Sequence, residues 1–365
     1  MVAAQETNLR EILEGAKQYR VPLYQRVYSW TGKQIDQLWD DIVETAESRM
    51  SDSRVTHFIG SLVLAATPDF GPVGLMKYLV VDGQQRLTTL TLLLAAIRDH
   101  LLDTRQDPSA VERIGYQYLI NQWQEGQPKL LPTRADRDSY LAVINRSPGA
   151  GGEDGIGAAY RRLRGKLAEI EAPDDDASDD VGASVCVKDI ETTVLNGLAL
   201  VSVTASGNDN VYRIFESLNN TGLKLTQADL LKNYLFMRLG DRSRAVYEAV
   251  WLPLERHLSP DQLELLFWLD LVRTDEKARQ SETYEGQQRR LERLTSVDQV
   301  EAEVRRIAGL GALLETILKP ERDPDPELRR RLKRMRDWGT RTAYPIILEL
   351  LRPSCGEDAR DAGRY

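Results

Sequence analysis

The chain has 365 residues, of which 42% are hydrophobic and 28% are charged, and its formal net charge is −8. This composition is typical of a globular protein with two or three structural units. The negative net charge excludes a generally basic surface, so any contact with DNA has to use a local basic patch.

The lengths of the apolar runs and the positions of cysteine and histidine argue against a membrane protein, a secreted protein and a zinc protein. No apolar run reaches the ~20 residues of a membrane span, and the N-terminus lacks the apolar core of a signal peptide, so we expect a cytoplasmic protein that does not enter a membrane. Cysteine and histidine are scarce and widely separated, so their spacing forms no zinc-binding set and no metal site of an HNH nuclease. These residues are Cys186, Cys355, His57, His100 and His257.

The N-terminal part alternates short helices with extended segments. Residues 8–14 are predicted to form a helix that begins with a capping-box spacing. Residues 19–23 are predicted to be extended, and Pro22 confines this segment to an edge strand or to the end of a strand. Residues 24–30 are rich in aromatic and hydrogen-bonding side chains. A second capping box at Thr31 begins an amphipathic helix.

Two apolar segments follow, and they predict a β-hairpin. Residues 57–66 and 78–81 have the composition of strands, and a segment rich in Gly and Pro joins them. Directly after the second strand the apolar period becomes helical, over residues 84–102.

The turn between this strand and helix carries Asp82, Gly83, Gln84, Gln85 and Arg86. Free N–H groups and the helix dipole favour an anion at such a position. The simpler interpretation is that Asp82 caps the helix and pairs with Arg86 while the glutamines are solvated. The residues alone leave both interpretations open.

The rest of the chain is mainly helical. We predict a domain over residues 1–239, with its core at about 1–102 and 195–239, a helical insertion at 103–194 and an acidic linker at 173–184. A helical domain follows over 240–365, and its basic run 329–336 is the best local candidate for contact with a phosphate backbone. Asn219, Asn220 and Thr221 lie in a turn between two helices, where they either cap the helices or hold a phosphate or a metal-bound water.

Four motifs occur in fixed order: VPLYQRVYSW, HFIGSLVLA, VVDGQQRLTTL and FESLNNTGLKLTQADLLKNYL. Together they resemble the N-terminal domain shared by GmrSD-type modification-dependent restriction enzymes and by the SspE-type effectors of phosphorothioate-sensing bacterial defence. The resemblance extends over about residues 5–240. It implies an α+β fold, with a small mixed core like that of ParB and sulfiredoxin and extensive α-helical additions.

The resemblance also implies a function. Members of the family hydrolyse nucleoside triphosphates, often GTP, and they sense modified phage DNA; for this chain we expect hydrolysis with Mg²⁺. They usually carry an HNH nuclease domain further along the chain, which this sequence lacks up to Tyr365, so we expect a nuclease in a separate partner or in a longer protein. The redox chemistry of sulfiredoxin is not expected, since neither cysteine lies in a motif.

The residue chemistry agrees with a nucleotide site at the turn. No Walker A loop is present, so the anion donors have to be others, such as Arg86 as a bidentate phosphate ligand. Asp82 is the candidate for Mg²⁺ or a water, and Gln84 or Gln85 would orient the attacking water. The remaining nucleotide-binding candidates are Gly83, Thr88, Asn219, Asn220 and Thr221.

A second group of candidates would recognise the DNA modification. Sulfur in place of a phosphate oxygen is softer and a poorer hydrogen-bond acceptor, so a discriminating pocket offers apolar surface beside a charged donor. The candidates are Tyr24, Gln25, Arg26, Tyr28 and Trp30. Alternatively, these aromatics belong to the core and Arg26 pairs internally. Two other functions also fit the sequence: a non-catalytic DNA-binding regulator related to ParB, and a scaffold for a partner nuclease.

Overall fold

A computed structural model describes residues 2–66, 74–122, 126–171, 184–205, 226–275, 277–339 and 341–352. It divides into two units, Met1–Gly222 and Leu223–Tyr365. The predicted boundary at 239/240 differs from this division by one helix, α9 (Gln227–Leu239), which packs against helices of the second unit. The predicted residues Asn219, Asn220 and Thr221 lie outside the described residues, as does most of the predicted acidic linker.

The first unit is organised around a mixed sheet in the order β1-β6-β3-β4-β2-β5. Strands β3, β4 and β6 form its centre, where β3 runs antiparallel to β4 and parallel to β6. Strand β2 lies between β4 and β5 and is parallel to both. The bounds are β1 Val2–Asn8, β2 Lys17–Arg20, β3 His57–Ala66, β4 Met76–Asp82, β5 Leu130–Leu131 and β6 Leu198–Ala205.

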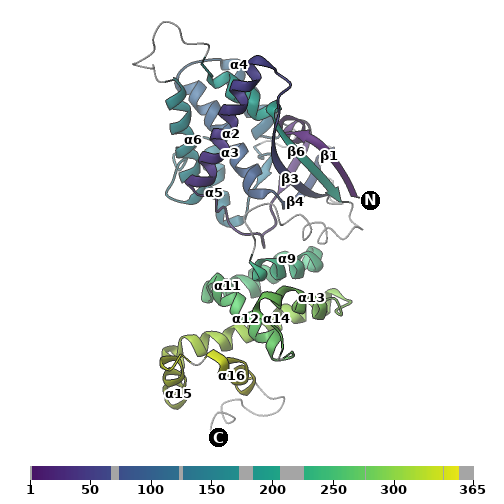
Figure 1. Ribbon diagram of the computed structural model, residues 1–365, viewed down its shortest axis with the longest axis vertical. Helices are drawn as coiled ribbons and strands as arrows, with labels where there is room; N and C mark the ends of the chain where they lie inside the picture. Colours follow the sequence, from purple (N-terminus) through teal and green to yellow (C-terminus); the bar gives the residue numbers. More distant parts are fainter. Residues whose placement is uncertain are drawn as a thin grey trace. The chain divides into compact units, whose positions relative to one another are not determined.

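Helices of the first unit gather beside this sheet, with α2, α3, α5 and α6 next to one another in Figure 1. Their bounds are α1 Leu9–Leu13, α2 Gly32–Ser51, α3 Gln84–Asp103, α4 Pro108–Arg113, α5 Arg134–Ile144, α6 Gly155–Glu171 and α7 Val187–Thr192. Two π-helical segments, η2 (Ile114–Leu119) and η3 (Thr193–Gly197), follow α4 and α7.

Helix α3 is the centre of the first unit. It is buried on all sides, with Leu92, Leu93 and Leu94 completely shielded from solvent. A helix that is buried on all sides needs neighbours on all sides, and α4, α5, α6 and α7 contact α3. The first turn of α3, with its polar side chains, is thereby fixed against the end of strand β4.

The second unit is helical in its described residues. The bounds are α9 Gln227–Leu239, α10 Ser243–Val246, α11 Leu252–His257, α12 Pro260–Val272, α13 Thr283–Leu291, α14 Val297–Leu318, α15 Pro326–Asp337 and α16 Tyr344–Leu350. An aromatic group forms part of its core, where the Trp251 ring lies 5.4 Å from Phe236 and 6.2 Å from Phe267 between centroids. A buried ionic cluster centred on Asp270 joins α12 to α13 and α14.

Most predicted elements are present. Strand β3 has the predicted bounds, α3 extends the predicted helix by one residue, and Gln34 accepts the Thr31 backbone N–H at 2.9 Å, as a capping box requires. Strand β1 was not predicted, and β5 lies inside the predicted helical insertion. The mixed α/β character is therefore confirmed, whereas the likeness to ParB and sulfiredoxin stays a prediction. No helix among the described residues is both long and apolar enough to span a membrane.

Candidate functional site

The turn between β4 and α3 depends on Gly83. This residue is the N-cap of α3 and has φ +85°, a conformation that side chains disfavour. A Cβ at this position would lie 3.0 Å from the Ser61 carbonyl oxygen of β3. The N-cap is therefore Gly83, and no side chain caps the helix. This differs from the simpler interpretation of the sequence, in which the Asp82 carboxylate caps α3.

Asp82 and Arg86 lie on the two sides of Gly83 and are both half-buried. Burial raises the pKa of Asp82, while the Gly83 N–H and the charges of Arg86 and Arg26 act in the opposite direction. Burial lowers the pKa of Arg86, and Asp82 opposes that shift. Three charged side chains from two segments therefore influence one another in surroundings that are partly shielded from water.

Strand β3 holds the Arg86 guanidinium in place. Arg86 Nη1 donates to the Ser61 carbonyl oxygen at 2.7 Å. The register of β3 against β6 shifts between Phe58 and Ser61, and Gly60 in this bulge has φ +107°. A Cβ on Gly60 would lie 2.6 Å from Arg86 Nη2, so the absence of a side chain there makes room for the guanidinium.

Gln84 and Gln85 connect the turn to the segment after β2. Gln84 Nε2 donates to the Arg26 carbonyl at 3.0 Å. Gln85 Nε2 donates to the Val27 carbonyl at 3.1 Å, and its Oε1 accepts the Ser29 N–H at 2.8 Å. Both glutamines are buried, with exposed fractions of 8% and 7%, so the alternative in which they are solvated is wrong.

These hydrogen bonds hold residues 24–30, which we call the aromatic loop, against α3. Gln25 Nε2 donates to the Val81 carbonyl at 3.1 Å, at the end of β4. The Tyr28 hydroxyl lies 2.7 Å from Thr89 Oγ1, and the Tyr28 N–H donates to Asp136 at 2.9 Å. The structure therefore brings the two predicted groups of candidates together, although they are more than fifty residues apart in the sequence.

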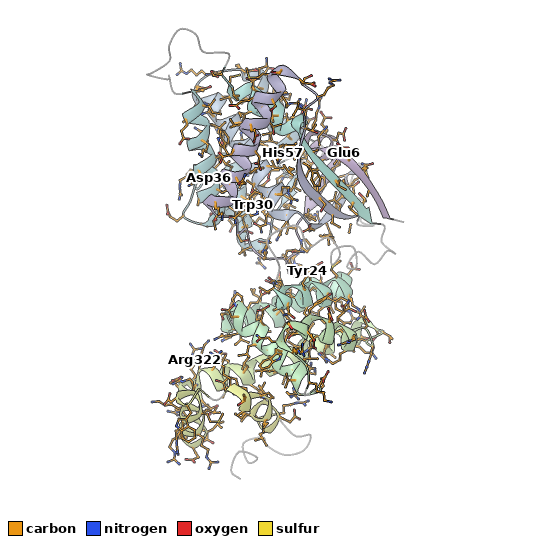
Figure 2. The ribbon with its side chains drawn as sticks, in the orientation of Figure 1. Glu6, Tyr24, Trp30, Asp36, His57 and Arg322 are labelled. Atoms are coloured by element: carbon orange, nitrogen blue, oxygen red, sulfur yellow. The ribbon has the colours of Figure 1, made fainter. Side chains whose placement is uncertain are left out.

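The aromatic loop exposes other residues than the sequence suggested. Tyr24 and Tyr28 are each 8% exposed, burial raises the pKa of both phenols, and Trp30 packs against the core of the unit. Tyr24 and Trp30 are labelled in Figure 2. Val27, which sequence reasoning missed, is 50% exposed. The exposed apolar group on the loop is therefore Val27, which lies between Arg26 and Tyr28 in the sequence.

The remaining predicted residues and the possible metal ligands complete the site. Thr88 is buried on the second turn of α3, with 4% of its surface exposed. In the described part of the chain, no group of three or more His, Cys, Asp or Glu side chains is arranged to hold a metal ion. Asp82 remains the candidate ligand, with Mg²⁺ completed by water or by oxygens of a substrate.

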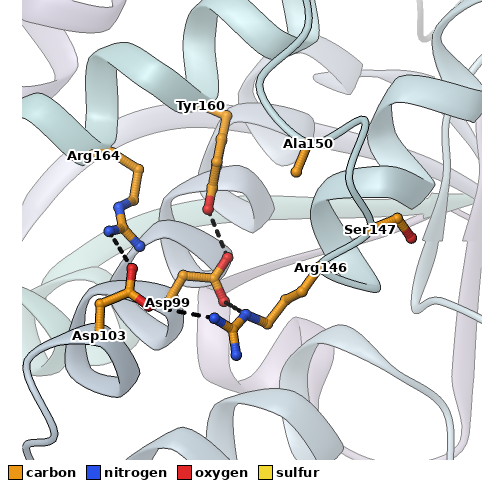
Figure 3. Close-up of a pocket in the computed structure, with 7 residues that line it drawn as sticks. All are labelled: Asp99, Asp103, Arg146, Ser147, Ala150, Tyr160 and Arg164. Atoms are coloured by element: carbon orange, nitrogen blue, oxygen red, sulfur yellow. Dashed lines mark hydrogen bonds and ion pairs between the residues drawn. The ribbon is translucent and has the colours of Figure 1, made fainter.

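A charged cavity of about 320 Å³ lies at the other end of α3 from the turn (Figure 3). Tyr160 donates to Asp99 at 2.7 Å, and Arg146 and Arg98 lie 3.0 and 2.8 Å from the same carboxylate. Arg164 pairs with Asp103 at 2.7 Å. Both carboxylates of this cavity are paired with arginines, so the cluster is accounted for as ionic contacts that hold the end of α3 against its neighbours.

Fold and site together define a mixed α/β domain whose charged strand-to-helix turn is clamped to an aromatic loop. Residues 9–236 match the family model described as GmrSD restriction endonuclease, N-terminal domain. Because the match covers more than half of the chain, the chain belongs to this family. A comparison with curated proteins finds no match.

Proposed function

We propose that the chain is a nucleoside triphosphatase, with GTP as the expected substrate, that senses modified DNA in antiphage defence in the cytoplasm and controls an HNH nuclease. The observation that carries the proposal is the cluster of Asp82, Arg86 and Arg26 at the start of α3, in a domain of the GmrSD family. Phosphorothioate is the modification that the aromatic loop suits best.

The triphosphate would bind at the first turn of α3. The N–H groups of Gln84, Gln85 and Arg86 have no carbonyl partner within the helix, and the helix dipole adds positive potential. Arg86 would neutralise charge that develops on the transferred phosphoryl group, a role that contributes ~10³-fold or more in other enzymes of this class. Gly83 allows the phosphates to approach the backbone closely, and Thr88 supports the turn from within the helix.

The turn fits Mg²⁺ that is coordinated mainly by the phosphate oxygens of the bound nucleotide. Asp82 offers one carboxylate, and Mg²⁺ commonly takes one or two carboxylates together with phosphate oxygens and waters. The bound ion would neutralise phosphate charge. Since burial raises the pKa of Asp82, a cation beside the carboxylate also relieves the cost of keeping it ionised.

We propose for the two glutamines a role other than orienting the attacking water. Their amide groups are engaged with the aromatic loop at 2.8–3.1 Å, so we propose that they couple the loop to the turn. DNA at the loop would meet Val27 and the Arg26 guanidinium, one apolar group beside one cation. A shift of the loop would then pull on the first turn of α3.

Phosphate release under multiple turnover tests the proposal. The purified chain is assayed with GTP and ATP in the presence of Mg²⁺, without DNA and with plain, phosphorothioated or glucosylated duplexes of one sequence. We expect turnover that requires Mg²⁺ and rises with phosphorothioated DNA. Salt-dependent DNA binding without any turnover would favour the non-catalytic regulator instead.

A further inference from the structure

A cavity of about 340 Å³ lies at the end of the sheet away from the turn between β4 and α3. It is lined by Glu14, Gly15, Tyr116, Gln117, Gln122 and Lys129. The volume is at the lower end of the range for small-molecule sites. Its charged lining residues are Glu14 and Lys129, whereas the cavity in Figure 3 is lined by two aspartates and two arginines.

The cation of this lining is Lys129. This residue is 3% exposed, and its ammonium group donates to the Gly15 carbonyl. No acidic side chain of the described residues forms an ion pair with it, and the nearby Glu14 pairs with Arg10 at 2.9 Å. Buried charges are normally paired, so an ammonium group in this position is short of one anion.

A second lysine, Lys17, lies close enough to act on the charge of Lys129. Lys17 donates to the Glu11 carbonyl at 2.5 Å, and burial lowers its pKa although Glu11 and Glu14 oppose the shift. Burial and the charge of Lys17 lower the pKa of Lys129 to about 8, against the attraction of Glu14. The carbonyl groups at the end of α1 accept one N–H from each lysine, which leaves further donors on both ammonium groups.

The other wall offers a ring and amide groups. Tyr116 and Gln117 belong to the π-helical segment η2, a rare geometry that is frequent at functional sites. The Tyr116 side chain is 54% exposed, so its ring is available for stacking. Just beyond η2, the Asn121 side chain is fully buried, and both of its polar atoms lack a hydrogen-bond partner among the described residues.

This cavity is separate from the turn at Asp82. Strands β2 and β4 are parallel, and Lys17 pairs with Met76 at the start of β4. Asp82 follows six residues later, which is about 20 Å along the strand at ~3.3 Å per residue. A small ligand at Lys129 therefore does not reach the first turn of α3.

We propose that this cavity binds a nucleoside monophosphate group, with the phosphate at Lys129, the base against the Tyr116 ring and base-edge hydrogen bonds to Gln117 and Gln122. The group is either a free nucleotide or the 5′-terminal nucleotide of a nucleic acid. A phosphate supplies the missing anion, and base–aromatic stacking contributes about 1–3 kcal/mol per base in comparable sites.

Calorimetric titration of the full chain at pH 7.0 tests the proposal without any hydrolysis. The probes are 2′-deoxyadenosine 5′-monophosphate, deoxyadenosine and inorganic phosphate. We expect the nucleotide to bind at least tenfold more tightly than either fragment. A trinucleotide with a 5′-phosphate, compared with one bearing a 5′-hydroxyl, then separates a nucleic-acid end from a free nucleotide, because only the former gains affinity from the added nucleotides.

Variants locate the binding. Tyr116→Ala should weaken nucleotide binding about tenfold and Tyr116→Phe should leave it unchanged, since the ring is the interacting group. Lys129→Met should abolish binding, whereas Lys188→Met, at an exposed lysine, should not affect it. Because calorimetry measures the binding of a monophosphate and not turnover, this result does not depend on the proposed hydrolytic activity.

The pH profile provides a signature that a purely structural lysine would not give. With the pKa of Lys129 near 8 and Lys17, Glu14 and Tyr116 facing it, affinity should fall about tenfold from pH 7.0 to 9.0, because only the ammonium form attracts the phosphate. An unshifted lysine would give a flat profile over this range. Undetectable binding at millimolar nucleotide, a flat profile, or unchanged binding by Tyr116→Ala and Lys129→Met would each overturn the proposal.

Discussion

Replacement of Gln85 by alanine tests whether the glutamines of the turn hold the aromatic loop. The variant loses the hydrogen bonds to the Val27 carbonyl and from the Ser29 N–H, at 3.1 and 2.8 Å. Each hydrogen bond contributes about 0.5–1.5 kcal/mol, so the local cost is about 2 kcal/mol. Water can reach Val27 and Ser29, both of which are exposed, and this limits the loss to that order.

Hydrogen exchange of the Ser29 amide measures this effect directly. A cost of about 2 kcal/mol corresponds to a loss of protection of about 30-fold at this amide. Gln106→Ala, at an exposed glutamine, is the matched control and should leave the Ser29 protection unchanged. Gln85→Glu should fall between the two, because a carboxylate still accepts the Ser29 N–H but cannot donate to Val27. If the Ser29 amide exchanges at the wild-type rate in Gln85→Ala, Gln85 does not hold the aromatic loop against α3.

Three further predictions concern the glycine bulge and the buried charges. Gly60→Ala should reduce NTP turnover and destabilise the first unit, since its Cβ meets Arg86, whereas Gly165→Ala, with nothing within 4 Å, should do neither; equal turnover in the two variants would contradict this. Asp82→Asn should increase the free energy of unfolding at pH 7, and chemical denaturation should show the gain disappearing as pH falls below the raised pKa of Asp82, where the wild-type carboxyl is also neutral. Asp270→Ala should destabilise the second unit by about 3–5 kcal/mol, because Arg306 and Arg290 lose a carboxylate partner; an unfolding free energy in urea within about 1 kcal/mol of wild type would contradict this. Burial raises the pKa of Asp270, but the two arginines outweigh burial and hold this pKa below its usual value. In the wild type the stabilisation from Asp270 is therefore lost as pH falls below about 3.8.

The main strands and helices could be predicted because their signals are local. The β3 and β4 segments combine β-branched and apolar residues between turn residues, and α3 begins where the apolar period changes. Strand β1 was missed because residues 2–8 contain Ala, Gln, Glu and Asn, which are poor strand formers. The segment is held as a strand by its antiparallel pairing with β6, which its own composition does not indicate.

The sequence predicted that the charged turn joins a strand to a helix, but it did not predict the partners of the side chains in that turn. A sequence shows that glutamines occupy a turn, but it does not show that their amides meet the backbone of a segment fifty-six residues away. Gly60 was the available signal for the Arg86 contact, because an isolated glycine inside a strand indicates a bulge or a close approach. Alternating burial along residues 24–30 depends on packing against α3, so the exposure of Val27 could not be anticipated.

The most direct test of the central claim is the turnover of Arg86→Ala in the NTP assay with Mg²⁺. We predict a loss of ~10³-fold or more relative to the wild type, as expected for an arginine that stabilises the transferred phosphoryl group. Circular dichroism and the urea midpoint verify that the variant is folded. A folded Arg86→Ala protein with wild-type turnover would contradict the assignment of hydrolysis to the turn between β4 and α3.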